Sequence, residues 1–251
     1  MKKIFLPQSI LFIAATSFTI STVKAGNEKP AIVASMTSAA DNDSLITDSK
    51  MSARDMADAL YTSLELKKVG LKKEAVETAY QGFQHLVAKG AVSNPDILTI
   101  ADFSQSSDNK RLYIIDLKNN KLLINTYVAH GKNSGLKMAD KFSNTMSSLQ
   151  SSLGFYVTRG TYTGKHGLSL RLDGMDKGFN DNAMARAIVV HGATYIGDSR
   201  KGAAFQGRSF GCPAVPQEYS QKVINLIKDG STLFIYKPDA KYMNSSKVLN
   251  G

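Results

Sequence analysis

The chain has 251 residues, of which 43% are hydrophobic and 21% are charged. A chain of this length buries roughly 70–75% of its unfolded surface, enough for one large domain or a catalytic domain with a small companion. This excludes a disordered chain, a collagen-like repeat and a disulfide-stapled miniprotein. The net charge is +10, but the basic residues are scattered, so they indicate a nucleic-acid surface only weakly, and we expect no nucleic-acid partner. An anionic wall or membrane surface explains the charge better.

Residues 1–25 are predicted to be a secretory signal peptide. Lys2 and Lys3 supply the positive charge, an apolar run over 10–20 follows, and residues 23–25 offer the small side chains that a signal peptidase accepts. The apolar run is short for a bilayer span, and an uncleaved anchor is the alternative. Cleavage lowers the net charge from +10 to +7. With no cysteine near the cleavage point and no later apolar span, we expect an exported protein, with the periplasm as the favoured compartment.

The segment 26–95 is predicted to hold a flexible lead-in, over 26–48, and a helical hairpin. Ser52 and Asp55 form a capping signature for a helix through Leu66, and a second helix runs from about 71 to 89, where Gly90 ends it. The second helix carries an apolar stripe typical of a packing face, formed by Val76, Ala79, Tyr80, Phe83, Leu86 and Val87.

From Pro95 onward the apolar pattern changes from helical to strand-like, and we expect a separate domain over 96–240, followed by a C-terminal tail over 241–251. A helix is predicted over 218–228. Strands are predicted over 97–103, 111–117, 122–130, 155–158, 168–172, 186–191 and 231–237, with a hairpin turn at Asn119-Asn120 and a long polar loop over 132–154. Short strands separated by glycines predict a mainly β fold, a sandwich or partly closed barrel decorated by helices.

Cys212 is the only cysteine of the chain. Oxidising compartments favour paired cysteines or none, so a lone thiol in an exported protein is either buried and inert or kept for its chemistry. A β-branched strand delivers His191 to its end, and Cys212 follows Gly211 further along the chain. An imidazole can activate a thiol as nucleophile and return the proton to a leaving amine. The backbone N–H groups of Gly211 and Cys212 are candidate donors to the oxyanion.

Simpler alternatives exist for each residue, because a histidine at a strand end is often structural and a cysteine after glycine is often a core filler. Their conjunction in an exported chain favours the catalytic interpretation. A metal site is disfavoured since the four histidines and one cysteine lack ligand spacing, and no phosphate or dinucleotide glycine motif is present. Papain-like peptidases place cysteine before histidine, sortases end in a different strand motif, and caspases are not exported.

The order His-Gly, then about twenty residues, then Ser-x-Gly-Cys resembles the catalytic domain of YkuD-type L,D-transpeptidases, which remodel bacterial peptidoglycan. The likeness covers roughly residues 96–237 and is closest to the murein L,D-transpeptidase catalytic domain-like subgroup. The further segments that carry it are 111–117, Val128-Ala129-His130-Gly131, Phe142-Ser143-Asn144, 152–156 and Leu170-Arg171-Leu172-Asp173-Gly174.

The resemblance implies a YkuD-type fold with Cys212 as nucleophile and His191 as its base. It further implies that Gly192 orients the imidazole through its carbonyl, and that Ser209 and Gly211 shape the oxyanion pocket. The sequence departs from the common signature at two places. Phe210 stands where many members carry a second histidine, and Pro213-Ala214 replaces a hydrophobic residue followed by Arg or Asn. These departures leave the nucleophile and base intact but bear on donor specificity and rate.

Several further residues are candidates for substrate binding. His166 lies in a loop that can line the cleft, His130 closes a strand, and Arg208 and Arg171 can pair with a carboxylate of the substrate. Phe210 joins them as a neighbour of the nucleophile. His85, in the N-terminal helices, is expected to be structural.

The resemblance implies acyl transfer on peptidoglycan stem peptides. The Cys212 thiolate attacks the carbonyl between the third and fourth stem residues, D-alanine leaves, and a second stem amine resolves the thioester into a 3-3 crosslink. Water as acceptor would make the protein an L,D-carboxypeptidase, and a free D-amino acid or a lipoprotein lysine are further acceptors. A non-catalytic peptidoglycan-binding protein of the same fold is the alternative from another class. No cofactor or metal is expected, and the sequence leaves the oligomeric state open.

Overall fold

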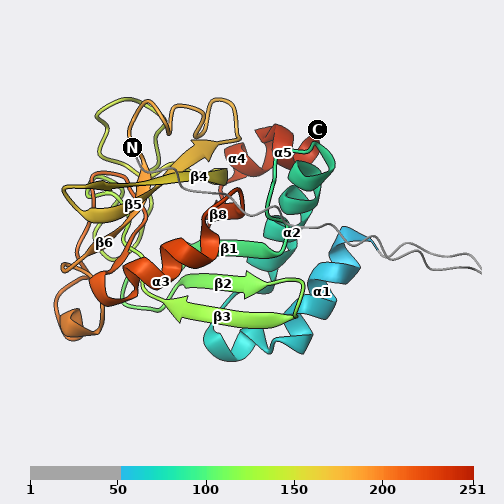
Figure 1. Cartoon of the computed structure of the whole chain (residues 1–251), viewed down its shortest axis with the longest axis horizontal. Coiled ribbons are helices and arrows are strands. Elements are labelled where there is room, and N and C mark those ends of the chain that lie inside the picture. Colours follow the sequence, from blue (N-terminus) through green and yellow to red (C-terminus); the bar gives the residue numbers. More distant parts are fainter. Residues whose placement is uncertain (1–51) are drawn as a thin grey trace, which may run out of the picture. The chain divides into compact units, whose positions relative to one another are not determined.

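The computed structural model describes residues 52–251, so the predicted signal peptide and lead-in lie outside the described residues. The helices are α1 (Ala53–Ser63), η1 (Leu66–Val69), α2 (Lys73–Ala88), η2 (Asp198–Arg200), α3 (Gln217–Ile227), α4 (Ala240–Ser245) and α5 (Lys247–Asn250). The strands are β1 (Ile97–Asp102), β2 (Leu112–Asp116), β3 (Lys121–Thr126), β4 (Gly154–Gly164), β5 (Gly167–Gly174), β6 (Val189–Ala193), β7 (Ala214–Pro216) and β8 (Thr232–Tyr236) (Figure 1).

The predicted helical hairpin is present at the start of the described chain. Ser52 and Asp55 form a reciprocal capping box at the N-terminus of α1, as their spacing predicts. α1 ends at Ser63 rather than at Leu66, because Glu65 adopts a left-handed conformation with φ of 49° and the chain continues as the short 3₁₀ helix η1. α2 then packs its apolar face against α1, β1 and β8.

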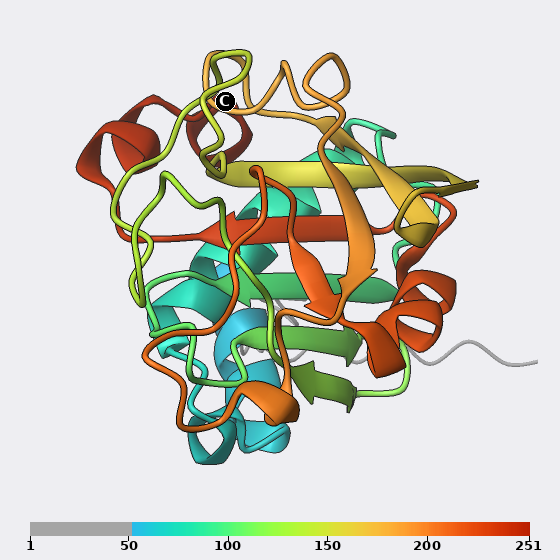
Figure 2. The same cartoon turned by 90° about the vertical axis from the view of Figure 1, so that its left-hand side faces the viewer.

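All eight strands of the described residues join one sheet in the order β3-β2-β1-β8-β4-β5-β6-β7. β1 pairs in parallel with β8, and β6 with β7, while the other neighbours are antiparallel. In the view of Figure 2, β6 runs across the direction of β8, so the sheet curls toward a partly closed barrel. The predicted mainly β class, with helices at its borders, is therefore confirmed.

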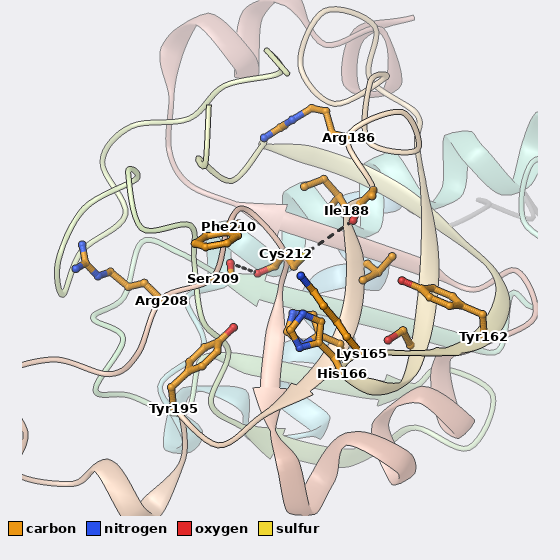
Figure 3. Close-up of a pocket in the computed structure, with 14 residues that line it drawn as sticks. Tyr162, Lys165, His166, Arg186, Ile188, Tyr195, Arg208, Ser209, Phe210 and Cys212 are labelled. Carbon is orange, nitrogen blue, oxygen red and sulfur yellow. Dashed lines mark hydrogen bonds between the residues drawn. The ribbon is translucent and has the colours of Figure 1, made fainter. Parts of the chain in front are cut away.

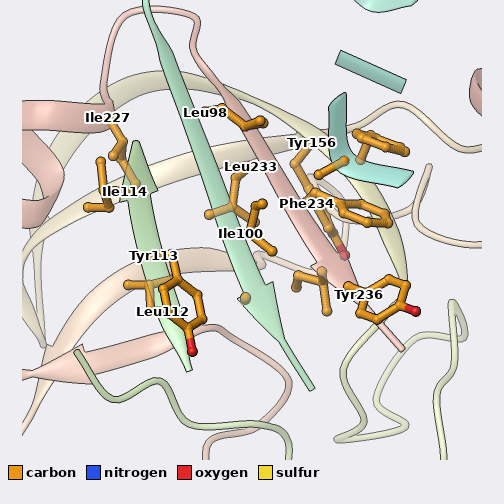
Figure 4. Close-up of a cluster of buried hydrophobic side chains, with 14 of the residues drawn as sticks. Leu98, Ile100, Leu112, Tyr113, Ile114, Tyr156, Ile227, Leu233, Phe234 and Tyr236 are labelled. Carbon is orange, nitrogen blue, oxygen red and sulfur yellow. The ribbon is translucent and has the colours of Figure 1, made fainter. Parts of the chain in front are cut away.

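Aromatic and aliphatic side chains fill the space between the central strands and the helices (Figure 4). Phe155 of β4 and Phe234 of β8 stack with their ring centroids 4.1 Å apart. Gly82 of α2 lies directly on this pair, since a Cβ atom there would come within 2.1 Å of the Phe155 ring. The missing side chain lets α2 approach the sheet closely, which fixes the helical hairpin against β4.

The segment 241–251, predicted only as a C-terminal tail, contains most of α4 and all of α5. Asp239 and Ser246 cap these helices, and α5 packs against α2. Tyr242 and Ser246 both donate hydrogen bonds to the buried carboxylate of Asp176, which also accepts the backbone N–H of Phe155. The C-terminus is thus tied to β4 through a single buried acid.

Strand limits differ from the predicted ones where single residues break the ladder. β3 ends at Thr126, and residues up to 131 continue as isolated bridges to Ala214 and Ser209. β4 is longer than predicted and reaches Gly164. β6 begins at Val189 rather than at 186, because Ala187 has a positive φ of 55°. No helix within residues 52–251 combines the length and the apolar character that crossing a membrane requires.

Candidate active site

Two neighbouring parallel strands bring the predicted cysteine and histidine to one place. β6 and β7 pair with His191 opposite Ala214. Cys212 lies two residues before Ala214, so it stands at the level of Val189, the first residue of β6. Both His191 and Cys212 line the same pocket. The short strand β7, which sequence analysis did not predict, therefore makes this juxtaposition possible.

His191 is held in one orientation by the residue that follows it. Its Nδ1 atom lies 2.8 Å from the Gly192 carbonyl oxygen. A carbonyl only accepts, so Nδ1 carries the proton and Nε2 is left with a free lone pair. A Cβ at Gly192 would come within 2.8 Å of Ser220 and still closer to Gln217. Only glycine fits there, which explains the His-Gly pair in structural terms.

Burial lowers the pKa of His191, which is 3% exposed. The hydrogen bond to Gly192 raises the pKa of His191, and the electrostatic effects of His166 and Lys165 lower it further. The imidazole is therefore neutral at neutral pH and able to accept a proton.

The turn that carries the thiol is closed by the Ser209 side chain. Its Oγ atom accepts the Gly211 N–H at 3.0 Å and donates to the Cys212 carbonyl oxygen at 2.6 Å. The Ser209 N–H donates in turn to the carbonyl oxygen of His130 at 2.9 Å. Gly211 has a φ of 125°, a conformation that favours glycine. Ser209 and Gly211 thus shape the backbone around the nucleophile candidate.

This turn changes the expectation for the oxyanion donors. The Gly211 N–H is already used by Ser209 Oγ, so it is not free to bind an oxyanion. The Cys212 N–H has no acceptor among the residues that the structure describes. Of the two backbone donors that sequence analysis named, only the second is therefore available.

The Cys212 thiol donates its hydrogen bond to the segment just before β6 and not to His191. Sγ lies 3.8 Å from the Ala187 carbonyl oxygen, a contact drawn in Figure 3. Burial raises the pKa of Cys212, while a backbone hydrogen bond from Val189 and the charges of Arg186 and Lys165 lower it. Burial is the largest of these effects. The resting pair is thus a protonated thiol beside a neutral imidazole.

The pocket above the thiol has a volume of about 390 Å³. Figure 3 shows its polar side chains arranged around Cys212 from several elements. No aspartate or glutamate is among the lining residues of this pocket, whereas lysine, arginine and histidine are. The lining comprises Tyr162, Lys165, His166, Ser169, Arg186, Ala187, Ile188, Val189, His191, Tyr195, Arg208, Ser209, Phe210 and Cys212. Its charge suits an anionic ligand.

Arg208 and Phe210 reach the pocket, as expected of substrate-binding candidates. Arg208 Nη1 donates to the carbonyl oxygens of Lys132 and Gly135, at 2.8 and 3.1 Å, and the guanidinium lies over the ring of Phe205. Phe210 is 64% exposed and carries the Lys132 ammonium 4.7 Å from its ring centroid. Phe210 therefore offers an open aromatic face at the pocket rim.

His166 and Arg171 lie at different places relative to the pocket. His166 stacks on His191, with ring centroids 4.2 Å apart and an angle of 21° between the planes. Arg171 does not line the pocket, although it lies on the same face of β5 as Ser169, which does. Its guanidinium lies 4.5 Å from the centroid of the Tyr162 ring. Arg171 thus supports a pocket residue from outside.

His130 lies in the interior and not in the pocket. Its Nδ1 atom is 2.7 Å from Nη2 of the fully buried Arg111. Burial, with the charge of Arg111, lowers the pKa of His130 to about 4, and burial lowers the pKa of Arg111 to about 9. Neutral His130 then accepts from the guanidinium. The pair supports the backbone that binds Ser209, a structural role.

Eight residues of the pocket lining were not predicted from the sequence: Tyr162, Lys165, Ser169, Arg186, Ala187, Ile188, Val189 and Tyr195. Lys165 directly precedes the predicted His166, but a single charge in a loop gives no signal of its own. Arg186 joins the long polar loop to the pocket, since Nη1 donates to the Ser143 carbonyl oxygen and Nη2 to the Gln150 carbonyl oxygen, both at 2.7 Å. This loop lies far from Arg186 in sequence, so only the fold reveals the contact. Within residues 52–251, no cluster of three His, Cys, Asp or Glu side chains could hold a metal ion.

A family model described as the L,D-transpeptidase catalytic domain matches residues 67–236. No curated protein sequence matches the chain. The matched range begins in η1 and ends with β8, so it includes α2 and the whole sheet.

Among solved structures, an L,D-transpeptidase from Mycobacterium smegmatis is 12% identical with a TM-score of 0.34, over 57% of this chain and 59% of that chain. The chain thus spans 59% of the length of that relative. An L,D-transpeptidase from Stackebrandtia nassauensis is 12% identical with a TM-score of 0.35, over 75% of this chain and 92% of that chain. The helical cell shape determining protein Pgp2 from Campylobacter jejuni is 12% identical with a TM-score of 0.40, over 68% of this chain and 61% of that chain.

Proposed function

The chain belongs to the L,D-transpeptidase catalytic domain family, and we propose that it is an exported cysteine acyltransferase that forms 3-3 crosslinks between peptidoglycan stem peptides. The observation that supports this most is the meeting of His191 and Cys212 in one pocket, with His191 Nδ1 bound to the Gly192 carbonyl. That bond leaves Nε2 as the only ring atom that can take a proton from the thiol.

Acylation starts from a neutral pair. His191 Nε2 accepts the Cys212 proton as Sγ attacks the carbonyl carbon between the third and fourth stem residues. The Cys212 N–H, which has no other acceptor among the described residues, stabilises the oxyanion. When the C–N bond breaks, the imidazolium returns the proton to the leaving amine of D-alanine. The product is a thioester on Cys212.

Deacylation reverses these roles with a new nucleophile. An amine of a second stem loses its proton to His191 and attacks the thioester, and the thiol takes the proton back. If water enters instead, the product is a shortened stem, and the protein is an L,D-carboxypeptidase. A non-catalytic peptidoglycan-binding protein remains the alternative of another class, because Sγ rests against Ala187 rather than His191.

The lining of the pocket supports a stem peptide as ligand. Peptidoglycan stems carry several carboxylates, and the pocket presents Lys165, Arg186 and Arg208 without an acidic side chain among its lining residues. Assembled peptidoglycan lies outside the cytoplasmic membrane, which agrees with the proposed signal peptide over residues 1–25. We place the protein in the periplasm for the same reason.

Acylation by a carbapenem tests the proposed nucleophile directly. The β-lactam carbonyl is attacked by Sγ and the ring opens, so the folded protein gains the full mass of the inhibitor and no group leaves. We expect one adduct per molecule in intact-mass spectrometry and none in the Cys212→Ala variant. Folded protein that stays unmodified under excess carbapenem, or an adduct that persists in Cys212→Ala, would contradict the assignment.

The histidine stack makes the pH dependence of acylation a second test. Below the pKa of His191 the imidazolium cannot accept the thiol proton, so the rate falls on the acid side. Since burial, His166 and Lys165 lower this pKa, the acid limb of the wild-type profile is expected below the ordinary histidine value of about 6.5.

His166→Ala removes a ring whose electrostatic effect lowers the pKa of His191 and opens His191 to water, and both changes raise that pKa. The acid limb of single-turnover carbapenem acylation should therefore move to higher pH. His85→Ala, on α2 outside the pocket, serves as the control and should leave the limb in place. If the acid limb of His166→Ala stays at the wild-type pH or moves to lower pH, His166 does not lower the pKa of His191.

A further inference from the structure

Lys165 and His166 form the two-residue tip of the hairpin between β4 and β5. The last pair of the ladder joins Gly164 and Gly167, and Gly167 has a φ of 72° that suits the turn. One aromatic contact links the hairpin tip to β6: His166 stacks on His191. Within the hairpin, Arg171 of β5 lies over the ring of Tyr162 of β4. In Figure 3 the Lys165 side chain extends from this tip toward Cys212.

Three lysine and arginine side chains line the pocket, and they differ in what they already bind. Arg186 donates to four oxygen atoms of the polar loop, those of Ser143, Ser148, Gln150 and Ser152. Arg208 donates to two backbone carbonyls and lies over Phe205. The Lys165 ammonium has neither a hydrogen bond nor an ion pair within residues 52–251. Its three donors are available to a ligand.

The position of this free ammonium matches one particular group of the proposed substrate. In a stem that ends one residue after the scissile bond, the leaving residue carries a free carboxylate. Backbone geometry places that carboxylate within about 4 Å of the scissile carbonyl carbon. A cation directed at the nucleophile is therefore within reach of it. In a longer stem the same position is a neutral peptide group, which gives an ammonium much less to bind.

Resting on the proposed function, we infer that Lys165 binds the C-terminal carboxylate of the leaving residue and so selects donor stems that end one residue after the scissile bond. The interaction is made before the thioester forms and is lost when the leaving residue departs. Lys165 is thus a specificity-determining residue of the donor site, distinct from the nucleophile and the base.

The test compares a disaccharide-tetrapeptide with the same compound carrying a C-terminal carboxamide. Both donors lose their fourth residue, as D-alanine or D-alaninamide, so liquid chromatography with mass spectrometry follows both reactions. Wild type should prefer the free acid by about 10- to 100-fold in kcat/KM, the value of a charge-assisted hydrogen bond. Lys165→Met should reduce this preference to about threefold or less, mainly by lowering the kcat/KM for the free-acid donor. Lys165→Arg should retain most of the preference.

Lys222→Met on α3, an exposed lysine outside the pocket lining, is the matched control and should keep the wild-type preference. Binding of both compounds to Cys212→Ala, with and without Lys165→Met, provides a readout independent of turnover and should show the same loss. The inference is overturned if the wild-type protein has the same kcat/KM for both donors, or if Lys165→Met keeps the wild-type preference for the free acid. Wild type that converts neither donor would refute the proposed function itself, an outcome distinct from the other two.

Discussion

Replacing His191 by glutamine is expected to lower the kcat/KM for stem-peptide conversion by about 100- to 10,000-fold, the usual contribution of a general base. Glutamine fills most of the same volume but cannot take the thiol proton. The half-buried thiol has a raised pKa, so without the base the thiolate is scarce at neutral pH. Loss of the base should therefore affect acylation more than substrate binding.

His166→Gln is the matched control because it changes a histidine of the same pocket that stacks on His191. We expect it to retain activity within about tenfold, since it removes no proton acceptor of the proposed mechanism. Rates of carbapenem acylation and stem-peptide conversion would be compared in both variants, with circular dichroism to verify folding. Equal losses in the two variants, or an active His191→Gln protein, would rule out His191 as the base.

The second large effect concerns stability and lies in the buried Asp176 cluster. Asp176→Ala leaves three donors without their acceptor in the interior: the backbone N–H of Phe155 and the hydroxyls of Tyr242 and Ser246. Each unsatisfied buried donor costs about 1–3 kcal/mol. Burial raises the pKa of Asp176, so removing the acid also relieves a desolvation penalty. We expect a net loss of about 3 kcal/mol in the free energy of unfolding.

Urea unfolding followed by circular dichroism measures this loss. Asp181→Ala is a suitable control, because the Asp181 carboxylate accepts hydrogen bonds in the same loop region but at the exposed surface. Its cost should stay within about 1 kcal/mol. Similar costs for both variants would show that Asp176 does not anchor the C-terminal helices.

The parts of the fold that depend on local pattern are predictable from the sequence. The capping box at Ser52 sets the start of α1, and the Asn119-Asn120 turn joins β2 to β3. The run of β-branched residues before His191 belongs to β6, as expected. The resemblance predicts that the His-Gly pair belongs to the site. Its physical basis is the contact of His191 Nδ1 with the Gly192 carbonyl oxygen and the close packing of Gly192 against α3.

The features that depend on contacts between segments distant in the chain could not be predicted from the sequence. α4 and α5 are too short to give a periodic signal, and their burial against Asp176 and α2 decides their conformation. Arg186 matters because the fold lays the polar loop beside it. Lys165 gains its place from a two-residue turn that bends over the pocket.

Arg171 lies outside the pocket lining, and the strand period does not reveal this. It shares one face of β5 with Ser169, which lines the pocket, and its guanidinium lies over the Tyr162 ring. Its role as a ligand of the substrate stays a prediction. The Gly211 N–H is a similar case, because no pattern in the sequence indicates that Ser209 Oγ already accepts it.

Mass spectrometry of disaccharide-tetrapeptide muropeptides, incubated with the mature protein or its Cys212→Ala variant, tests the central claim most directly. The proposed mechanism predicts crosslinked dimers that have lost one D-alanine, formed by wild type and absent with the variant. Tripeptide monomers alone would assign the chain as an L,D-carboxypeptidase. Unchanged substrate with folded wild-type protein, or dimers that still form with Cys212→Ala, would contradict a cysteine acyltransferase.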